Sequence, residues 1–326
     1  MRKHMWIGVL FALVCLYFAF RGISIKQLWN VLSRARPLPI LLALCIYFLE
    51  YHIRATRWAI LLRPIRVFPA SELFWPMIIG FFANNVLPLR MGELVRAHIS
   101  GTKLNISRTA SLGSILIERV CDTLSFLGTF LVASLFCPFP RYMEKGAWLL
   151  AGACLLVILT LILIRWHEES FRKALFRSPL PLSWKNKVNR LSTHFIHSTS
   201  GITQPRYVAE AMALSLVIWI IEGTFLFLVA HAFALDLKYA GAYFLLFALG
   251  LSVTLPQAPG YIGTFELFGI TALSLLGIPK SQGLPVVLAI HGTQFMFIAL
   301  LGVIGLWHEG LSFNSMTSST PTDQIE

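Results

Sequence analysis

Residues 208–233 read VAEAMALSLVIWIIEGTFLFLVAHAF and are almost wholly apolar. About 20 such residues in a helix are enough to cross the hydrocarbon core of a lipid bilayer. Comparable apolar runs recur along the chain, at residues 5–20, 39–53, 106–136, 147–164, 239–255 and 285–307. The sequence therefore predicts an all-α fold, a polytopic membrane bundle with about seven spans.

The amino-acid composition also indicates a membrane protein. Of the 326 residues, 56% are hydrophobic and 13% are charged, and the mean hydropathy is +0.71. Soluble globular domains carry about 25% charged residues. The composition therefore excludes a water-soluble enzyme, and it excludes a disordered, collagen-like or coiled-coil chain.

The net charge of the chain is +12, from 27 Lys and Arg against 15 Asp and Glu. Such an excess could serve nucleic-acid binding, but most of the basic residues stand between or beside the apolar runs. In that position they are typical of cytoplasmic loops and of contacts with anionic headgroups. We therefore expect a membrane surface, and no nucleic acid, as the partner of these residues.

Signatures of enzymes and of metal sites are missing from the sequence. The five cysteines are scattered through apolar segments without a C-x-x-C spacing, so they indicate neither a disulfide framework nor a metal site. The patterns G-x-S-x-G, H-E-x-x-H, Walker A and G-x-G-x-x-G do not occur. We predict no catalytic residue, no cofactor and no metal ion, and we expect that the protein is not an enzyme.

Three polar segments predict the orientation and the limits of the membrane domain. The chain starts with Met1-Arg2-Lys3-His4, and the apolar run after it lacks an A-x-A-like cleavage site, which favours a retained span and a cytoplasmic N-terminus. Residues 165–207 carry eight Lys or Arg against two Glu, which predicts a cytoplasmic loop. Residues 311–326 are expected to form a polar, disordered tail, so that the membrane domain covers residues 1–310. The expected location is the plasma (inner) membrane.

Two apolar runs, at residues 73–89 and 255–276, are interrupted by proline and glycine. Irregular backbone at membrane depth survives only inside the protein or beside a water-filled cavity. Both breaks are therefore predicted to be re-entrant or unwound helices that line a cavity, although turn chemistry would also permit a plain extramembrane turn at the second. Their similar Leu-Pro, Gly and Glu patterns favour an internal repeat, as in transporters. The residues assigned to the breaks are Asn85, Pro88, Gly92, Pro256, Pro259, Gly260 and Gly263.

A polar stripe runs along the predicted helix at residues 106–136. Its members are spaced by three or four residues and so share one helix face: Ser111, Ser114, Glu118, Asp122, Ser125 and Thr129. Serine and threonine commonly join membrane helices to one another. Acids inside a membrane, by contrast, usually mark a pathway or a cavity. We expect the stripe to face the protein interior or water.

Arginine and glutamate recur at helical spacing in two groups, each of which shares one helix face. The members are Glu50, Arg54 and Arg57 in the first group and Arg90, Glu93 and Arg96 in the second. A guanidinium group can bind a phosphate through two hydrogen bonds. It can also serve architecture alone, by pairing with an acid or by reaching the membrane surface. Both interpretations remain open for these arginines.

Four motifs in this order carry a resemblance to a known family: Arg54-x-x-Arg57-Trp58, Asn85-x-Leu87-Pro88-x-Arg90-x-Gly92-Glu93-x-x-Arg96, Glu118-Arg119-x-x-Asp122 and Pro256-x-x-Pro259-Gly260-x-x-Gly263-x-x-Glu266. In these motifs the chain resembles the flippase-like transmembrane region of lysylphosphatidylglycerol synthases, which also occurs as free-standing membrane proteins. The resemblance covers residues 5–308 and implies a helical membrane domain that moves or handles polar lipids between leaflets. It does not imply lysyl transfer, because the cytosolic domain for that reaction is absent.

Three functions are compatible with these observations. The first is a lipid translocase, or flippase, whose cavity accepts the polar headgroup of a phospholipid or a glycolipid. The second is an intramembrane transferase or hydrolase that acts on a lipid-linked substrate, with Glu118 or Asp122 as the base. The third is a membrane partner of a separate lipid synthase that does not itself transport. Of these, we expect the translocase.

The translocase hypothesis assigns a role to each polar residue of the motifs. The predicted headgroup ligands are Arg54, Arg57, Arg90, Arg96 and Arg119. The residues predicted to position them or to relay protons are Glu93, Glu118, Asp122 and Glu266. We expect all four acids and Arg119 to open onto one cavity, at which the two breaks meet. Glu222 is interpreted as a polar anchor, and His291 and Gln294 are interpreted as interhelical hydrogen-bonding groups.

Overall fold

The computed structural model describes residues 13–22, 24–87, 91–136, 139–178, 181, 184–186, 189, 204–254 and 259–311. Within these ranges all regular structure is helical, including residues 13–20. The further helices are α2 (Ile25–Leu32), α3 (Pro37–Leu62), α4 (Ala70–Val86), α5 (Gly92–Lys103), α6 (Arg108–Ser134), α7 (Arg141–Trp166), α8 (Glu168–Arg177), α10 (Pro205–Ala232), α11 (Tyr239–Thr254), η3 (Pro259–Tyr261), α12 (Thr264–Leu275) and α13 (Lys280–His308). The predicted all-α fold is confirmed.

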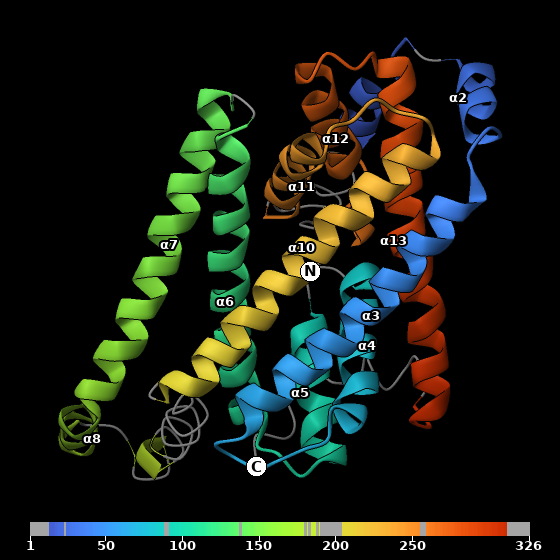
Figure 1. Cartoon of the computed structure of the whole chain (residues 1–326). Helices are drawn as coiled ribbons and strands as arrows, with labels where there is room; N and C mark the ends of the chain where they lie inside the picture. The colour runs from blue at the N-terminus through green and yellow to red at the C-terminus, as the bar shows by residue number, and fades with distance from the viewer. Residues whose placement is uncertain are drawn as a thin grey trace.

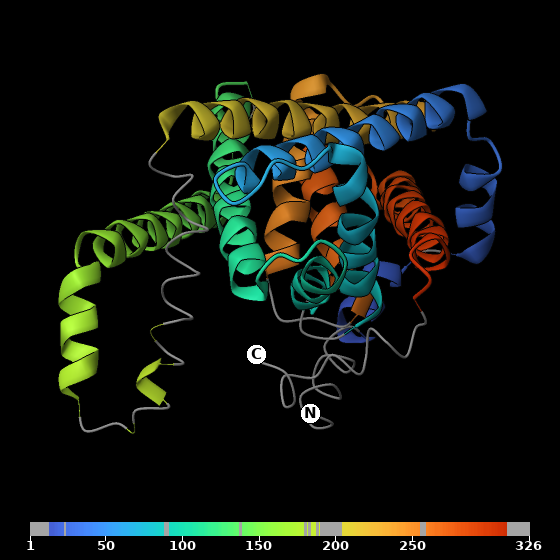
Figure 2. The same cartoon turned by 90° about the horizontal axis from the view of Figure 1, so that it is seen from below.

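Helices α3 and α10 lie side by side along much of their length (Figure 1). Each has a proline in its first turn, Pro37 and Pro205, where the missing N–H would have had no partner in the helix. Aromatic side chains join the two helices, as when Tyr47 stacks on Phe225 with ring centroids 4.7 Å apart. The pair forms one layer, against which α4, α6, α11 and α13 are arranged (Figure 2).

Helix α7 packs on α6 near its start and then leads away from the bundle toward α8 (Figure 2). Large apolar side chains on α7 are exposed, with Trp148 at 78% and Leu149 at 75% of their full accessible surface. Such a surface is unfavourable in water, at about 25 cal/mol for each Å² of apolar area. Acyl chains would cover it, so this face of α7 is the kind of surface that a lipid-exposed helix presents.

Four helices of the described part are long and apolar enough to cross a membrane: Pro37–Leu62, Arg141–Leu161, Arg206–Ala232 and Lys280–His308. They correspond to four of the apolar runs in the sequence. The run at residues 239–255 forms α11, which has only 16 residues, and the run at 106–136 forms α6, whose 27 residues include buried acids. Residues 1–12 and 312–326, with the predicted basic N-terminus and nearly all of the predicted tail, lie outside the described residues. The chain is an integral membrane protein.

The first predicted break separates α4 from α5, which fold back on one another as a hairpin. Gly92 lies so close to α4 that a Cβ atom on it would be 1.9 Å from the carbonyl oxygen of Gly80. The backbone N–H of Gly92 donates to Asn84 Oδ1 over 2.8 Å and so closes the hairpin. Pro88 and Arg90 lie outside the described residues.

The second predicted break separates α11 from α12 and contains the short helix η3. Its backbone turns through left-handed conformations at Gly260 (φ 72°), Tyr261 (φ 61°) and Gly263 (φ 92°). The carbonyl oxygen of Asn85, in the first break, lies 3.5 Å from the position of a Cβ atom on Gly260. The expectation that the two breaks meet in space is therefore confirmed. Pro256 lies outside the described residues.

Candidate functional site

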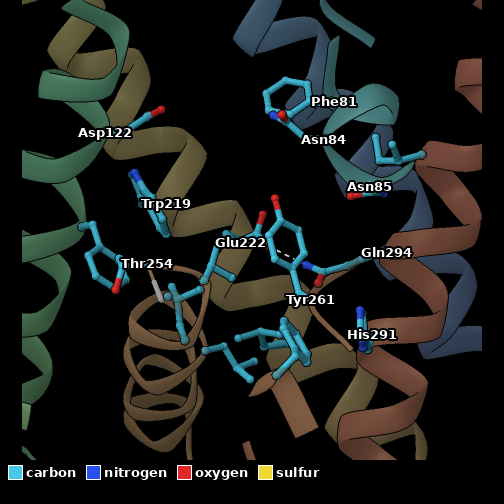
Figure 3. A pocket seen from close by; sticks show the side chains of 18 of the residues that line it. Phe81, Asn84, Asn85, Asp122, Trp219, Glu222, Thr254, Tyr261, His291 and Gln294 are labelled. Carbon is cyan, nitrogen blue, oxygen red and sulfur yellow. Dashed lines mark hydrogen bonds between the residues drawn. The ribbon is translucent and has the colours of Figure 1, made fainter. Parts of the chain in front are cut away.

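A cavity of about 370 Å³ lies among α3, α4, α6, α10, α11 and α13 (Figure 3). Both breaks contribute to its wall, through Asn85 of α4 and Tyr261 of η3. Aromatic and aliphatic side chains make up most of the remaining wall, among them Phe81, Phe126 and Trp219. The polar residues of the wall are Arg54, Asn84, Asn85, Arg119, Asp122, Thr123, Glu222, Thr254, Tyr261, His291 and Gln294.

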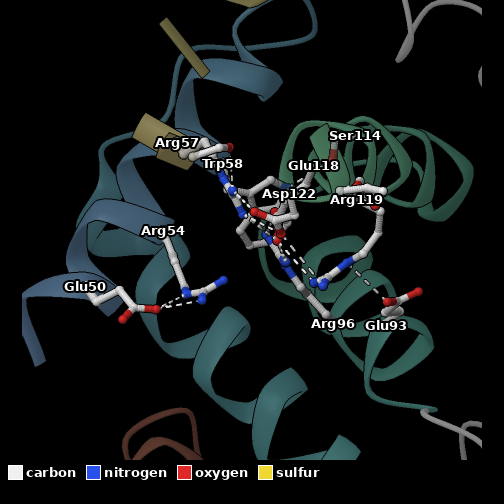
Figure 4. A network of polar contacts seen from close by, with 12 residues as sticks. Glu50, Arg54, Arg57, Trp58, Glu93, Arg96, Ser114, Glu118, Arg119 and Asp122 are labelled. Atoms are coloured by element: carbon white, nitrogen blue, oxygen red, sulfur yellow. Dashed lines mark hydrogen bonds and ion pairs between the residues drawn. The ribbon is translucent and has the colours of Figure 1, made fainter. Parts of the chain in front are cut away.

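A network of arginines and acids lies at one side of this cavity (Figure 4). At its centre the fully buried carboxylate of Glu118 accepts hydrogen bonds from Arg96 over 2.9 and 3.2 Å. The guanidinium groups of Arg57, at 3.2 Å, and Arg119, at 3.3 Å, also contact it. A charge without water must be paired, and Glu118 obtains its partners from α3, α5 and its own helix α6.

The terminal nitrogens of Arg57 and Arg96 are used within this network, whereas the buried Nε atom of each has no hydrogen-bond partner. Arg57 is fully buried and donates to both carboxylate oxygens of Asp122, and to Ser215 Oγ over 2.7 Å. The guanidinium group of Arg96 lies 3.5 Å from the centre of the Trp58 ring, a favourable cation–π position. Neither arginine lines the cavity. Both hold α3, α5 and α6 together and fix the acids of α6.

Of the three arginines around Glu118, Arg119 is the one that lines the cavity. Its side chain is 31% exposed, and its ion-pair distances are 3.3 Å to Glu118, 3.4 Å to Glu93 and 3.8 Å to Asp122. These contacts are longer than the usual 2.7–2.9 Å of a strong charged hydrogen bond. The guanidinium group of Arg119 is therefore held loosely and remains accessible to an anion in the cavity.

A second polar group lines the cavity and joins α3, α10 and α13. Arg54 donates to Glu50 over 2.7 Å, and its guanidinium group lies 3.9 Å from Glu222. Gln294 donates to the other oxygen of Glu222 over 2.6 Å. Arg54 also lies 5.6 Å from the centre of the Phe81 ring. Two cations, Arg119 and Arg54, thus belong to the wall of the cavity.

The structure places the predicted site residues unequally around the cavity. Arg54, Arg119, Asp122 and Asn85 line it. The expectation that Glu93, Glu118 and Glu266 open onto it is wrong. Three arginines enclose Glu118, and Arg119 pairs with Glu93. Glu266 caps α12 by accepting from the N–H of Gly263 over 2.6 Å, and His291 covers its other oxygen.

The polar stripe on α6 faces the protein, as predicted. Ser111, Ser114 and Glu118 are fully buried, Ser125 is 1% exposed, and Asp122 is 5% exposed. The stripe combines both functions that were considered for it. Ser114 accepts a hydrogen bond from Trp58 of α3 over 3.0 Å, which joins helices, whereas Asp122 lines the cavity.

Glu222, His291 and Gln294 were not expected to line the cavity. The bond between Gln294 of α13 and Glu222 of α10 confirms the prediction of an interhelical hydrogen bond and of a polar anchor. All three residues also line the cavity. The position of Glu222 could have indicated the cavity, since it is an acid in the middle of the apolar run 208–233.

These features define a polytopic integral membrane protein with a polar, aromatic-walled cavity at the meeting point of two broken helices. The chain belongs to the family described as the lysylphosphatidylglycerol synthase TM region, which matches residues 5–302. This match confirms the resemblance drawn from the four motifs. Membership indicates a membrane function related to lipids.

The chain is also similar to two membrane proteins and to part of a glycosyltransferase. A UPF0104 membrane protein of Methanothermobacter thermautotrophicus is 22% identical over 308 residues, which cover 88% of this chain and 90% of that protein. A second UPF0104 membrane protein of the same organism is 27% identical and covers 81% of each chain. Glycosyltransferase AglD of Haloferax volcanii is 29% identical over 122 residues, 37% of this chain and 20% of that protein. No solved structure matches the chain.

Proposed function

We propose that the protein binds the polar headgroup of an anionic lipid in this cavity and moves the lipid between leaflets. The observation that carries the proposal is Arg119, an accessible and loosely paired cation in a cavity that apolar helices enclose. A cation at membrane depth is costly unless it has an anionic partner or a function. The phosphate of a phospholipid or of a lipid-linked sugar supplies such a partner.

The size and the wall of the cavity suit a headgroup but not a whole lipid. A volume of about 370 Å³ lies at the lower end of the usual range of small-ligand pockets, about 300–1,000 Å³. The acyl chains would therefore remain in the bilayer while the headgroup enters. Arg119 and Arg54 would contact the phosphate, and the amides of Asn84, Asn85 and Gln294 could bind hydroxyl or ester oxygens.

The other arginines of the motifs have a positioning role in this proposal. Arg57 holds Asp122, and Arg96 holds Glu118, so that the acids beside Arg119 stay fixed. Fixed acids keep Arg119 extended toward the cavity without binding it tightly. The headgroup can then compete for the guanidinium group, because Asp122 and Glu118 remain paired with Arg57 and Arg96, and the Glu93 side chain is 36% exposed and can be solvated instead.

Acid–base catalysis inside the membrane is not favoured by this geometry. Glu118 accepts hydrogen bonds from or contacts three guanidinium groups, and both oxygens of Asp122 accept from Arg57. A general base needs a free lone pair within reach of the proton that it removes. Glu118 does not line the cavity, and Asp122 is held in an ion pair by Arg57, so we propose binding and transport instead of transfer or hydrolysis.

Replacement of Arg119 by glutamine should weaken the binding of a short-chain phosphatidylglycerol. Loss of a hydrogen bond to a charged group costs about 1.5–3 kcal/mol, which corresponds to roughly 10- to 100-fold in the dissociation constant. The remaining binding should depend less on salt, because one ionic contact is gone. Isothermal titration of the purified protein in detergent, at two salt concentrations, measures both quantities.

The matched control for this experiment is Arg63→Gln. Arg63 lies at the end of α3, is 37% exposed and pairs with Glu210 over 2.9 Å, outside the cavity. Arg63→Gln removes the same charge from the protein as Arg119→Gln does, so a general effect of net charge would appear in both variants. Equal affinities of wild type, Arg119→Gln and Arg63→Gln would refute the assignment of the headgroup site to this cavity.

A further inference from the structure

His291 of α13 connects the second break to α12 through both nitrogens of its ring. Nδ1 lies 2.6 Å from Glu266 Oε1, and Nε2 lies 2.7 Å from the carbonyl oxygen of Gly260. The Phe265 ring stacks on the imidazole with centroids 4.5 Å apart. The His291 side chain is 12% exposed and that of Glu266 is 4% exposed, so the pair lies mostly within the protein and meets the cavity at His291.

The two contacts of the His291 ring require two hydrogen atoms, one for each ring nitrogen. A carbonyl oxygen only accepts, so Nε2 of His291 must carry the hydrogen of its bond to Gly260. A neutral imidazole has no second N–H, yet the contact of Nδ1 with Glu266 is also a hydrogen bond by its length. One more proton must therefore lie between Nδ1 and Oε1. The pair is either an imidazolium with a carboxylate or an imidazole with a carboxylic acid, and both forms hold the same extra proton.

No other cation of the described residues contacts Glu266. Its second oxygen accepts from the backbone N–H of Gly263. Among other titratable or charged groups, Cys15 in the helix of residues 13–20 lies near Glu266, and Glu222 of α10 and Arg54 of α3 line the same cavity as His291. Arg54 is held by Glu50 and does not reach Glu266. The proton on the pair is thus what balances the charge of Glu266 in an apolar environment.

We propose that Glu266 and His291 form a proton-binding site that couples lipid movement to the uptake and release of a proton. This inference rests on the proposed function, since it supplies a driving ion for the same cavity. His291 and Tyr261 line the cavity, so the proton-binding site and the headgroup share one water-accessible space. The proton enters from water in the cavity, allows His291 to bond to Glu266 and Gly260 at the same time, and returns to water when the bond to Gly260 is lost.

Loss of the proton would release the second break. A neutral ring has a single N–H, which stays on Nδ1 because the Glu266 carboxylate is the stronger acceptor. The lone pair of Nε2 then faces the carbonyl oxygen of Gly260 over 2.7 Å, so that contact must open. The turn that this bond holds includes Tyr261, a residue with a side chain in a left-handed conformation that favours glycine. Freed from His291, the turn can relax and move Tyr261 in the cavity wall. Protonation therefore keeps the second break in the arrangement that the structure shows, and deprotonation releases it.

Glu266→Gln separates the hydrogen bonds of the site from its proton. The glutamine amide can donate to Nδ1 of a neutral His291, while its oxygen still accepts from Gly263, so the closed arrangement persists without a removable proton. In vesicles of phosphatidylcholine with fluorescently labelled phosphatidylglycerol, wild type should exchange the labelled lipid between leaflets at a rate that an imposed pH gradient changes. For Glu266→Gln, the ratio of rates with and without the gradient should fall to unity.

Glu210→Gln is the matched control, because it removes an acid from α10 that pairs with Arg63 and Arg206 outside the cavity. It should respond to the gradient as wild type does, and Glu266→Gln must retain the melting temperature of wild type for the comparison to hold. A wild-type exchange rate that is insensitive to the gradient, or a Glu266→Gln variant that remains sensitive, would overturn the coupling.

Histidine nitrogen resonances test the proton site independently of transport. In protein labelled with nitrogen-15 at histidine, the signals that disappear in His291→Gln belong to His291. In wild type these signals should change when a rise in pH removes the shared proton, whereas in Glu266→Gln they should keep the neutral-ring pattern over the same range. Identical responses of the two proteins would overturn the proton site. If the resonances behave as expected but wild type moves no lipid, the proposed function fails and the proton site stands.

Discussion

Replacement of Glu118 by glutamine should lower the free energy of unfolding by about 3–5 kcal/mol, because it leaves buried charges without their partner. Glu118 is the carboxylate that Arg96 and Arg57 share, and neither arginine has access to water that could solvate it instead. A glutamine keeps the shape of the side chain but removes the negative charge. The midpoint of thermal unfolding in detergent, followed by tryptophan fluorescence, should fall by several degrees.

Glu210→Gln provides the control for this measurement. Its carboxylate also contacts two arginines, Arg63 and Arg206, but the Arg206 side chain is 83% exposed and water can replace the lost partner. The unfolding midpoint of this variant should stay within the scatter of wild type. If Glu118→Gln unfolds at the same temperature as Glu210→Gln, the buried network does not stabilise the packing of α3, α5 and α6.

Gly92→Ala should prevent the hairpin of α4 and α5 from closing. A Cβ atom at this position would lie 1.9 Å from the carbonyl oxygen of Gly80 and 2.6 Å from Asn84 Oδ1. Backbone must move to relieve such a contact, and overpacking of this kind costs about 1–3 kcal/mol or more. The variant should therefore show a lower unfolding midpoint, and it should bind phosphatidylglycerol less tightly because Asn84 and Asn85 shape the cavity.

The control for the hairpin is Gly128→Ala. Gly128 lies within α6, and a Cβ atom there would meet nothing within 4 Å. Alanine is the better helix former by about 0.8–1.0 kcal/mol, so this variant should be as stable as wild type or more stable. A Gly92→Ala variant with wild-type stability would contradict the close approach of the two helices.

Much of the fold could be predicted from local patterns. The apolar run at residues 208–233 corresponds to α10, and the polar spacing of three and four residues predicted that one face of α6 is buried. The i, i+4 spacing of Glu50 and Arg54 also predicted the ion pair that the structure contains. These features depend on helix geometry and hydrophobicity, which neighbouring residues determine.

The partners of the remaining charges could not be predicted in the same way. Spacing on one helix suggested Glu93 as a neighbour of Arg96, but Arg96 pairs with Glu118 and Glu93 pairs with Arg119. These partners belong to different helices, and the side chains meet only once α5 and α6 have packed. For the same reason the sequence did not reveal that His291 lies between two acceptors, since one of them is a backbone carbonyl.

The central claim is that the cavity carries lipid headgroups between leaflets, and leaflet exchange by the purified protein tests it most directly. Vesicles are prepared with labelled phosphatidylglycerol, and dithionite, which cannot enter, destroys the label of the outer leaflet. Wild type and Arg63→Gln should expose the inner-leaflet label faster than protein-free vesicles do, and Arg119→Gln should lose most of this acceleration. No acceleration by wild type, or equal rates for wild type and Arg119→Gln, would contradict the claim.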